Sequence, residues 1–209
     1  MSSPRPNPKP SRQPQEGQYE TAVPTVRDRT VMTAAKIVLE PIFEANFLPV
    51  SFGFRPKRSA HQALEAVRIE ANRGRDWVLD ADIADCFGQI SHEALLAQMA
   101  GRVFDRRMLK LVKSWLKAGV LDDGVLSDPV SGTAQGSPIS PLLANVALHL
   151  LDEEWQRHGR RIGVLVRYSD DFVILCATWD RAQTARRGGR VNPNWPQRDA
   201  ADSSERRNT

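Results

Sequence analysis

The amino-acid sequence predicts an α+β fold in which a small antiparallel sheet is backed by helices. Two β-rich runs, 162–168 and 172–177, are separated only by the tripeptide Ser-Asp-Asp at 169–171, which is the pattern of a hairpin. A third strand-like run, 77–83, is apolar but interrupted by acidic residues. Elsewhere apolar residues recur at helical spacing, and a length of 209 residues suits about one domain with a substantial core.

Local signals predict where the first two helices lie. Apolar residues at helical spacing run through 30–47, and Pro41 is expected to kink or divide that helix because proline lacks the N–H that a helix interior needs. Ser59 followed by Gln62 is a capping-box pattern, which predicts a helix to about Arg73.

Three later helices have equally local start signals. Ser91 and Asp105 are predicted to cap two short helices, 92–100 and 106–118. A serine followed by a proline at 137–138 combines a cap with a first-turn proline, and predicts that a long helix begins there.

Composition divides the chain into three zones. Residues 1–22 are rich in proline, serine and glutamine, and predict a disordered N-terminal segment. Residues 23–180 carry the periodic patterns and form the expected domain. Residues 181–209 form an arginine-rich tail in which Val191 and Trp195 are the sizeable apolar side chains, so we expect this tail to be disordered as well.

The basic charge belongs mainly to the two ends of the chain. Residues 181–209 hold seven arginines against three acids, and residues 1–18 hold three bases against one acid, so the remainder is slightly acidic although the whole chain is +4. Overall basicity is therefore a weak indication of a nucleic-acid partner. A local basic stripe at helical spacing fits either a solvated face or a surface for a nucleic-acid backbone: Arg106, Lys110, Lys113 and Lys117.

The sequence also bears on the compartment. No apolar run approaches the ~18 residues of a membrane span, and the N-terminal zone lacks the hydrophobic stretch of a secretory signal. The two cysteines, Cys86 and Cys176, lie in apolar contexts that fit a reducing compartment. We expect a cytoplasmic bacterial protein with no membrane partner.

Acidic residues between apolar strands suggest a metal site. Asp170 and Asp171 are adjacent in a tight turn, where their mutual repulsion becomes tolerable if cations neutralise them. Such a pair alone is more often an ordinary hairpin turn, and Asp82 alone would be interpreted as a salt-bridged edge residue. Three carboxylates that converge on one sheet would supply the hard oxygen ligands that two Mg²⁺ ions require.

Five blocks of the sequence resemble, in the same order, the conserved blocks of group II intron reverse transcriptases. They are PTVRDRTVMTAAKIVLEPIFEANF, SFGFRPKRSAHQAL, WVLDADIADCFGQISHEAL, GTAQGSPISPLLANVALHLLDEEW and RYSDDFVILC, and they cover about residues 24–180. The third, fourth and fifth are similar to the first catalytic motif, the QG motif and the YADD box of that family. The resemblance implies a palm with part of the fingers.

The resemblance also implies a role for each matching residue. Asp82, Asp170 and Asp171 would be the catalytic triad that binds two Mg²⁺ ions, and Ile83 would add a backbone carbonyl to one of them.

Four further residues would bind the nucleotide. Phe87 would be a steric gate that rejects a ribose 2′-hydroxyl. Gln135 would contact the incoming nucleotide, and Gly136 would allow the backbone to approach it closely. Arg55 would contact the template or the nucleotide.

The implied reaction is the attack of a primer 3′-hydroxyl on the α-phosphorus of a dNTP, directed by an RNA template. The implied partners are an RNA template, a DNA primer, the dNTP and a group II intron RNA. Tyr19 stands where the family carries a triphosphate-binding arginine, and the thumb and maturase blocks that follow in the family have no match after Asp180. We therefore expect a truncated copy with little activity alone.

Two other functions stay open at this point. One is a non-catalytic RNA-binding or maturase-like remnant, which the missing blocks favour and the retained acids disfavour. The other is a diversity-generating or defence-associated reverse transcriptase, although SPISPLLANV and FRPKRSAH fit the intron type better.

Overall fold

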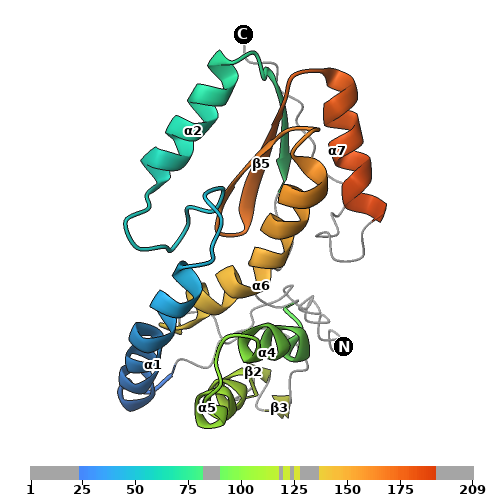
Figure 1. The fold of residues 1–209 in the computed structure, drawn as a ribbon. Helices are drawn as coiled ribbons and strands as arrows, with labels where there is room; N and C mark the ends of the chain where they lie inside the picture. Colours follow the sequence, from blue (N-terminus) through green and yellow to red (C-terminus); the bar gives the residue numbers. More distant parts are fainter. Residues whose placement is uncertain (1–23, 82–89, 118–119, 123–124, 128–136, 192–209) are drawn as a thin grey trace, which may run out of the picture.

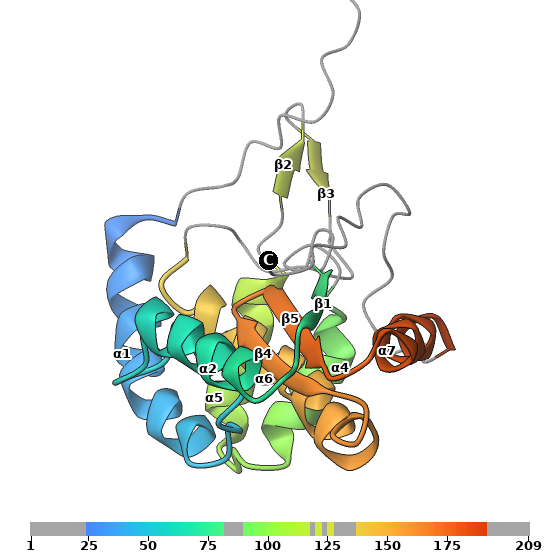
Figure 2. The ribbon, with the colours of Figure 1, turned by 90° about the horizontal axis from the view of Figure 1, so that it is seen from above.

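The computed structural model describes residues 24–81, 90–117, 120–122, 125–127 and 137–191, and it confirms the predicted α+β fold (Figure 1). Strands β1 (Trp77–Ala81), β4 (Val164–Tyr168) and β5 (Asp171–Cys176) form an antiparallel sheet in the order β1-β5-β4. Two short strands, β2 (Val120–Asp122) and β3 (Val125–Ser127), form a separate hairpin that projects away from this sheet (Figure 2).

The register of the sheet fixes what lies next to the predicted hairpin turn. Strands β4 and β5 pair from Val164 opposite Leu175 to Tyr168 opposite Asp171, so the hairpin is confirmed. Strand β1 lies on the other side of β5, and its last residue, Ala81, pairs with Phe172. The C-terminal end of β1 therefore lies beside the turn.

The first two helices largely follow their local signals. Helix α1 (Val26–Glu44) continues through Pro41 as one helix, so the expected division is wrong and the alternative, a kink, stays a prediction. Pro41 and Ile37, the residue whose carbonyl loses its partner, both lie on the exposed face, where water can bond that carbonyl. Helix α2 (Ala60–Asn72) begins with the predicted capping box of Ser59 and Gln62.

Three later helices follow: α4 and α5 lie in the lower part of the molecule in Figure 1, and α6 runs from there up to the sheet. Helix α4 (His92–Ala100) has Ser91 as its N-cap, and helix α5 (Arg106–Leu116) has Asp105, as predicted. Helix α6 (Ser140–Glu154) begins later than expected, and a π-helical turn, η1 (Trp155–Gly159), extends it. The hydroxyl of Ser137 donates to Met32 Sδ at 3.3 Å, so that serine does not cap α6.

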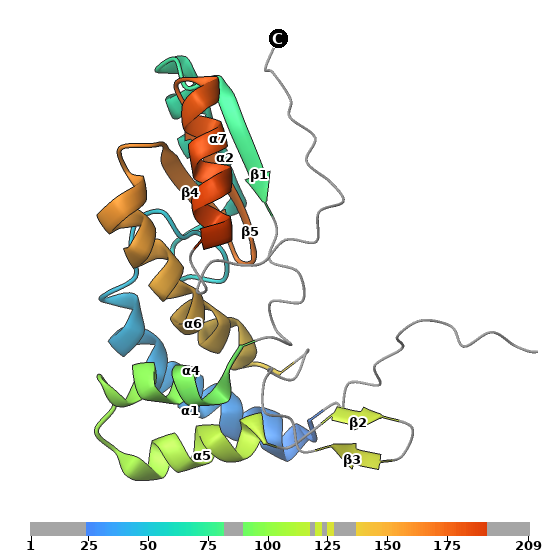
Figure 3. The same cartoon turned by 90° about the vertical axis from the view of Figure 1, so that its right-hand side faces the viewer.

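Helix α7 (Trp179–Val191) corrects the prediction that the chain is disordered from residue 181. It packs against β1 and β5 (Figure 3). The ring centroid of Trp179 lies 5.0 Å from that of Trp77. The buried side chains of Ala182 and Ala185 are small, so the helix backbone comes close to the sheet. Large apolar residues are not needed for that contact, which is why their scarcity misled the sequence prediction.

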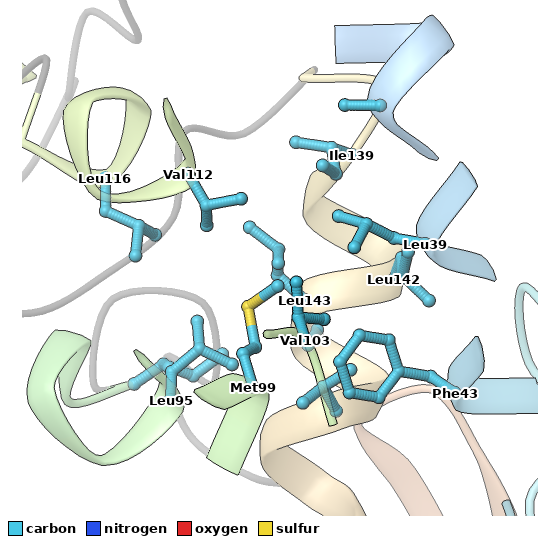
Figure 4. Packing of buried hydrophobic residues seen from close by; sticks show 14 of the residues in the cluster. Leu39, Phe43, Leu95, Met99, Val103, Val112, Leu116, Ile139, Leu142 and Leu143 are labelled. Atoms are coloured by element: carbon cyan, nitrogen blue, oxygen red, sulfur yellow. The ribbon is translucent and has the colours of Figure 1, made fainter. Parts of the chain in front are cut away.

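The core has a helical part and a sheet part. Buried side chains of α1, α4, α5 and the first half of α6 form one continuous apolar cluster (Figure 4). The sheet is covered on one face by α2 and on the other by the end of α6, η1 and α7. Among the described residues, no helix is both long and apolar enough to cross a membrane.

Candidate active site at the hairpin turn

The turn between β4 and β5 presents two adjacent carboxylates at one end of the sheet. Asp170 is half-buried and Asp171 is exposed, whereas Ser169 just before them is buried. Ser169 has a φ of 62°, in the left-handed region that residues with a Cβ rarely adopt. Such a conformation costs on the order of 1–3 kcal/mol and persists only where the surroundings enforce it.

Only part of the expected site falls within the described residues. Asp170, Asp171 and Arg55 are described, and the other predicted site residues lie outside: Asp82, Ile83, Phe87, Gln135 and Gly136. Within the described ranges, no three His, Cys, Asp or Glu side chains gather as a metal-binding group. The described part supplies two adjacent carboxylates, which are hard oxygen donors of the kind that Mg²⁺ prefers.

A loop that precedes α2 packs directly against the turn. A Cβ placed on Gly53 would lie 2.3 Å from the backbone nitrogen of Ser169, so the close approach of these two backbones requires glycine. Phe52 N–H donates to the carbonyl of Arg167 at 2.9 Å, and Arg167 N–H donates to the carbonyl of Val50 at 2.8 Å. The loop therefore continues the sheet beyond β4 as a short parallel bridge.

Arg55 closes this loop upon itself. Its side chain is 3% exposed and forms an ion pair with Glu44, with a shortest N–O distance of 2.6 Å. Nη1 also donates to the carbonyls of Leu48 and Ser51, each at 2.7 Å. The predicted contact of Arg55 with template or nucleotide stays a prediction, and it would require this set of hydrogen bonds to open.

Sequence reasoning missed a second buried arginine, Arg167, whose side chain is 0% exposed. Nε and Nη2 donate to the two carboxylate oxygens of Asp152, which is also 0% exposed, at 2.8 and 2.7 Å. Nη1 donates to the carbonyl of Ser169 at 2.7 Å and to Oδ1 of Asn145 at 3.1 Å. Nη2 donates to the hydroxyl of Ser51 at 2.8 Å.

A signal for this network is visible in the sequence of α6. Asn145 and Asp152 are seven residues apart, so they share one helix face, which is flanked by the buried Leu142 and Leu148. Polar side chains at that spacing within an apolar stripe call for a buried polar partner.

The cysteine of β5 is not a candidate nucleophile. Cys176 is fully buried beneath α7, and burial raises the pKa of its thiol to about 11. The thiol is therefore protonated near neutral pH and shielded from reagents. Among the described residues near the turn, the chemistry is that of the two carboxylates.

Comparison with known proteins agrees with this geometry. The profile of the family described as reverse transcriptase (RNA-dependent DNA polymerase) matches residues 7–188. The chain is 41% identical to the group II intron-encoded protein LtrA of Lactococcus lactis subsp. cremoris over 131 residues, which are 63% of this chain and 22% of that protein. It is 32% identical to protein YkfC of Escherichia coli over 188 residues, covering 73% of this chain and 49% of that protein.

Solved structures support the fold. Telomerase from Candida tropicalis in complex with a fragment of telomeric RNA matches with a TM-score of 0.54 and 12% identity, over 81% of this chain and 31% of that one. The apo telomerase truncated from its C-terminal domain matches with a TM-score of 0.52 and 12% identity, over 80% and 37%. The similarity to a group II intron-encoded protein and to an intron maturase supports the group II intron type, and this chain belongs to the reverse transcriptase family.

Proposed function

We propose that this chain carries the catalytic palm of an RNA-directed DNA polymerase that transfers a nucleotide from a dNTP to a primer 3′-hydroxyl. The observation that carries the proposal is the turn of Asp170 and Asp171, presented at the end of the sheet where β1 also ends. Ordinary hairpin turns tolerate aspartates, but this turn is additionally held in a strained conformation by a buried polar network.

The register supports Asp82 as the third carboxylate. Ala81 pairs with Phe172, which directly follows Asp171 in β5. Ala81 thus lies beside the turn, and consecutive Cα atoms are ~3.8 Å apart. We therefore expect the carboxylates of Asp82, Asp170 and Asp171 to form one site for two Mg²⁺ ions, with the Ile83 carbonyl as a further ligand.

These positions suggest which roles the metal ions and the protein residues would have in the proposed reaction. Bound Mg²⁺ would activate the primer hydroxyl and neutralise the charge of the triphosphate. The carboxylates of the chain would hold the cations in fixed positions, since nucleotidyl transfer depends mainly on positioning and on electrostatic stabilisation. Phe87 is proposed to exclude a ribose 2′-hydroxyl, and Gln135 with Gly136 to line the nucleotide site.

The proposed macromolecular partners are an RNA template with a DNA primer, and a group II intron RNA. The similarity to a protein named for its group II intron origin supports the intron RNA. Because the chain spans 22% of that relative's length, the whole relative's activity and partners are proposals for this chain. We also propose a cytoplasmic location in a bacterium.

Primer extension on an RNA template with Mg²⁺ tests the proposed activity. Single-nucleotide addition at low salt, with protein in excess over primer, is the appropriate assay because we expect the 209 residues alone to grip the duplex weakly. Asp171→Asn should abolish addition, and Asp76→Asn should leave it unchanged because that exposed residue precedes β1 at the opposite end of the sheet.

The same assay separates the enzyme from the RNA-binding alternative. Addition that Asp171→Asn does not reduce would contradict the proposed site. RNA binding without any nucleotide addition, and without measurable binding of Mn²⁺ as a Mg²⁺ substitute, would favour a non-catalytic RNA-binding remnant.

A further inference from the structure

We propose that Arg167 is a positioning residue that holds the turn of Asp170 and Asp171 in the conformation that presents both carboxylates. This role rests on the proposed function of that turn. Arg167 itself contacts neither a carboxylate of the turn nor the expected nucleotide site in the described contacts. It acts through the backbone of Ser169, which directly precedes the two aspartates.

Arg167 is fully buried although its side chain is charged. Arginine is almost never fully buried unless it is paired, and here both Arg167 and Asp152 are 0% exposed. Replacing a buried ion pair by well-packed apolar residues is often neutral or stabilising. Stability alone therefore does not explain why this charged pair is fully buried.

The directions of the hydrogen bonds supply the reason. A guanidinium has five N–H donors in a rigid planar fork, and all five have partners here. Two go to the Asp152 carboxylate, one to Asn145, one to Ser51 and one to the Ser169 carbonyl. Asp152 and Asn145 lie on α6, so the fork fixes the turn relative to that helix.

The turn is held from its other side as well. Asn145 Nδ2 donates to the carbonyl of Gly53 at 2.9 Å, and the Cα of Gly53 packs against the nitrogen of Ser169. Arg167 binds the carbonyl of the same serine, so the peptide groups on both sides of Ser169 are fixed. This closed arrangement explains how Ser169 keeps a φ of 62° without being glycine. Release of Arg167 would let the serine relax and redirect both carboxylates.

A charge-neutral double variant tests this role in the full chain. Arg167→Met with Asp152→Leu removes both buried charges together, which avoids leaving one of them unpaired. Asn145→Ala is a second variant, because it keeps the ion pair but removes both the bond to the Gly53 carbonyl and the bond that Asn145 accepts from Arg167. Trp155→Phe is the matched control, since it removes one buried donor to the carbonyl of Gly163, at the other end of β4.

Two measurements are needed on each folded protein: hydrogen exchange of the segment 168–172, and Mn²⁺ affinity from titration by electron paramagnetic resonance. We expect the double variant to exchange about tenfold faster in this segment and to bind Mn²⁺ at least about tenfold more weakly. Asn145→Ala should move both quantities in the same direction by less, and Trp155→Phe should move neither. Unchanged exchange, or unchanged Mn²⁺ affinity, in both the double variant and Asn145→Ala overturns the positioning role.

A separate variant distinguishes failure of this role from failure of the proposed function. Asp170→Asn with Asp171→Asn should abolish Mn²⁺ binding while leaving the Arg167 network in place. If that variant binds Mn²⁺ as the natural chain does, the carboxylates are not the metal site, and the proposed function fails together with the role built on it. If it loses Mn²⁺ and the Arg167 variants do not, only the positioning role fails.

Discussion

The helical region, formed by α1, α4, α5 and the first half of α6, differs in kind from the sheet region, formed by β1, β5, β4, α2, α7, η1 and the end of α6. The large buried side chains of the helical region are mainly apolar, whereas the sheet region buries the ion pair of Arg167 and Asp152. Asn145 of α6 bonds to that arginine where the two regions meet. Apolar packing is non-directional and accepts many similar arrangements, while a fully bonded polar network accepts one. The region that carries the candidate site is the one with the buried ion pair.

The two regions therefore differ in which interactions stabilise them. In the helical region, stability follows from the apolar area and volume that are buried, so each side chain contributes by filling space. In the sheet region, the ion pair of Arg167 and Asp152 contributes little net stability but makes the removal of one partner costly. Substitutions in the two regions should therefore change the free energy of unfolding in different ways.

The largest effect is expected from breaking the ion pair on one side. Arg167→Met alone leaves the buried carboxylate of Asp152 without its partner, and should lower the free energy of unfolding by about 3–5 kcal/mol. Adding Asp152→Leu should recover most of that loss. Urea denaturation followed by circular dichroism measures both values. Equal losses in the single and double variants would show that the cost does not come from leaving one buried charge unpaired.

A cavity in the helical region should cost slightly less and leave the site intact. Leu143 is 1% exposed in the apolar cluster, so Leu143→Ala should lower the free energy of unfolding by about 2–5 kcal/mol. Leu150 lies on the same helix but is 45% exposed, and Leu150→Ala should cost less than about 0.5 kcal/mol. Mn²⁺ affinity, measured where Leu143→Ala is still folded, should equal that of the natural chain, and a drop would mean that the two regions are coupled.

Sequence reasoning located much of the fold because the signals were local. The capping box of Ser59 and Gln62, the caps Ser91 and Asp105, and the hairpin around residues 169–171 each depend on neighbouring residues. The start of α6 was misplaced because its sequence offers serine-proline twice, at 137–138 and at 140–141. A tertiary contact with Met32 decides between them.

The site was predictable only where a motif marks it. Asp170 and Asp171 stand out as adjacent acids between apolar strands, and they lie in the turn as expected. The environment of Arg167 depends on residues as distant in the sequence as Ser51, and no local pattern reveals that arginine's burial. The assignments of Asp82, Ile83, Phe87, Gln135 and Gly136 remain predictions, since those residues lie outside the described ranges.

The basic side chains on the outer face of α5 allow a third test, because they fit either a solvated face or a surface for a nucleic-acid backbone. Arg106, Lys110 and Lys113 are exposed along α5, which has no acidic residue of its own. If this face contacts a nucleic-acid backbone, replacing all three by glutamine should reduce the slope of log affinity against log salt by about 2. Fluorescence anisotropy with an RNA oligonucleotide at several salt concentrations measures the slope. An unchanged slope would identify a solvated face. Arg68→Gln on α2, where Arg68 pairs with Glu65, is the control.

The smallest effect is expected at His149, on α6 where the helical and sheet regions meet. Its ring packs edge-on against Phe47 with centroids 5.6 Å apart, and its Nδ1 has no hydrogen-bond partner among the described residues. Burial lowers the pKa of this imidazole below its ordinary value of 6.5; the nearby Glu153 and Asp152 oppose that shift, and Arg102 and Arg167 add to it.

The sign of the pH dependence follows from that lowered pKa. Above about pH 6.5 the imidazole is neutral in both the folded and the unfolded chain, so it imposes no penalty. As the pH falls below that value, the unfolded chain takes up a proton that the folded chain resists, and stability is lost until the folded pKa is reached. Since His149→Leu removes this titration, the variant should gain stability relative to the natural chain between pH 7.5 and pH 5.5. Urea denaturation across this range gives the free energy of unfolding of both proteins as a function of pH. If the two curves run parallel, the burial of His149 does not couple folding to pH.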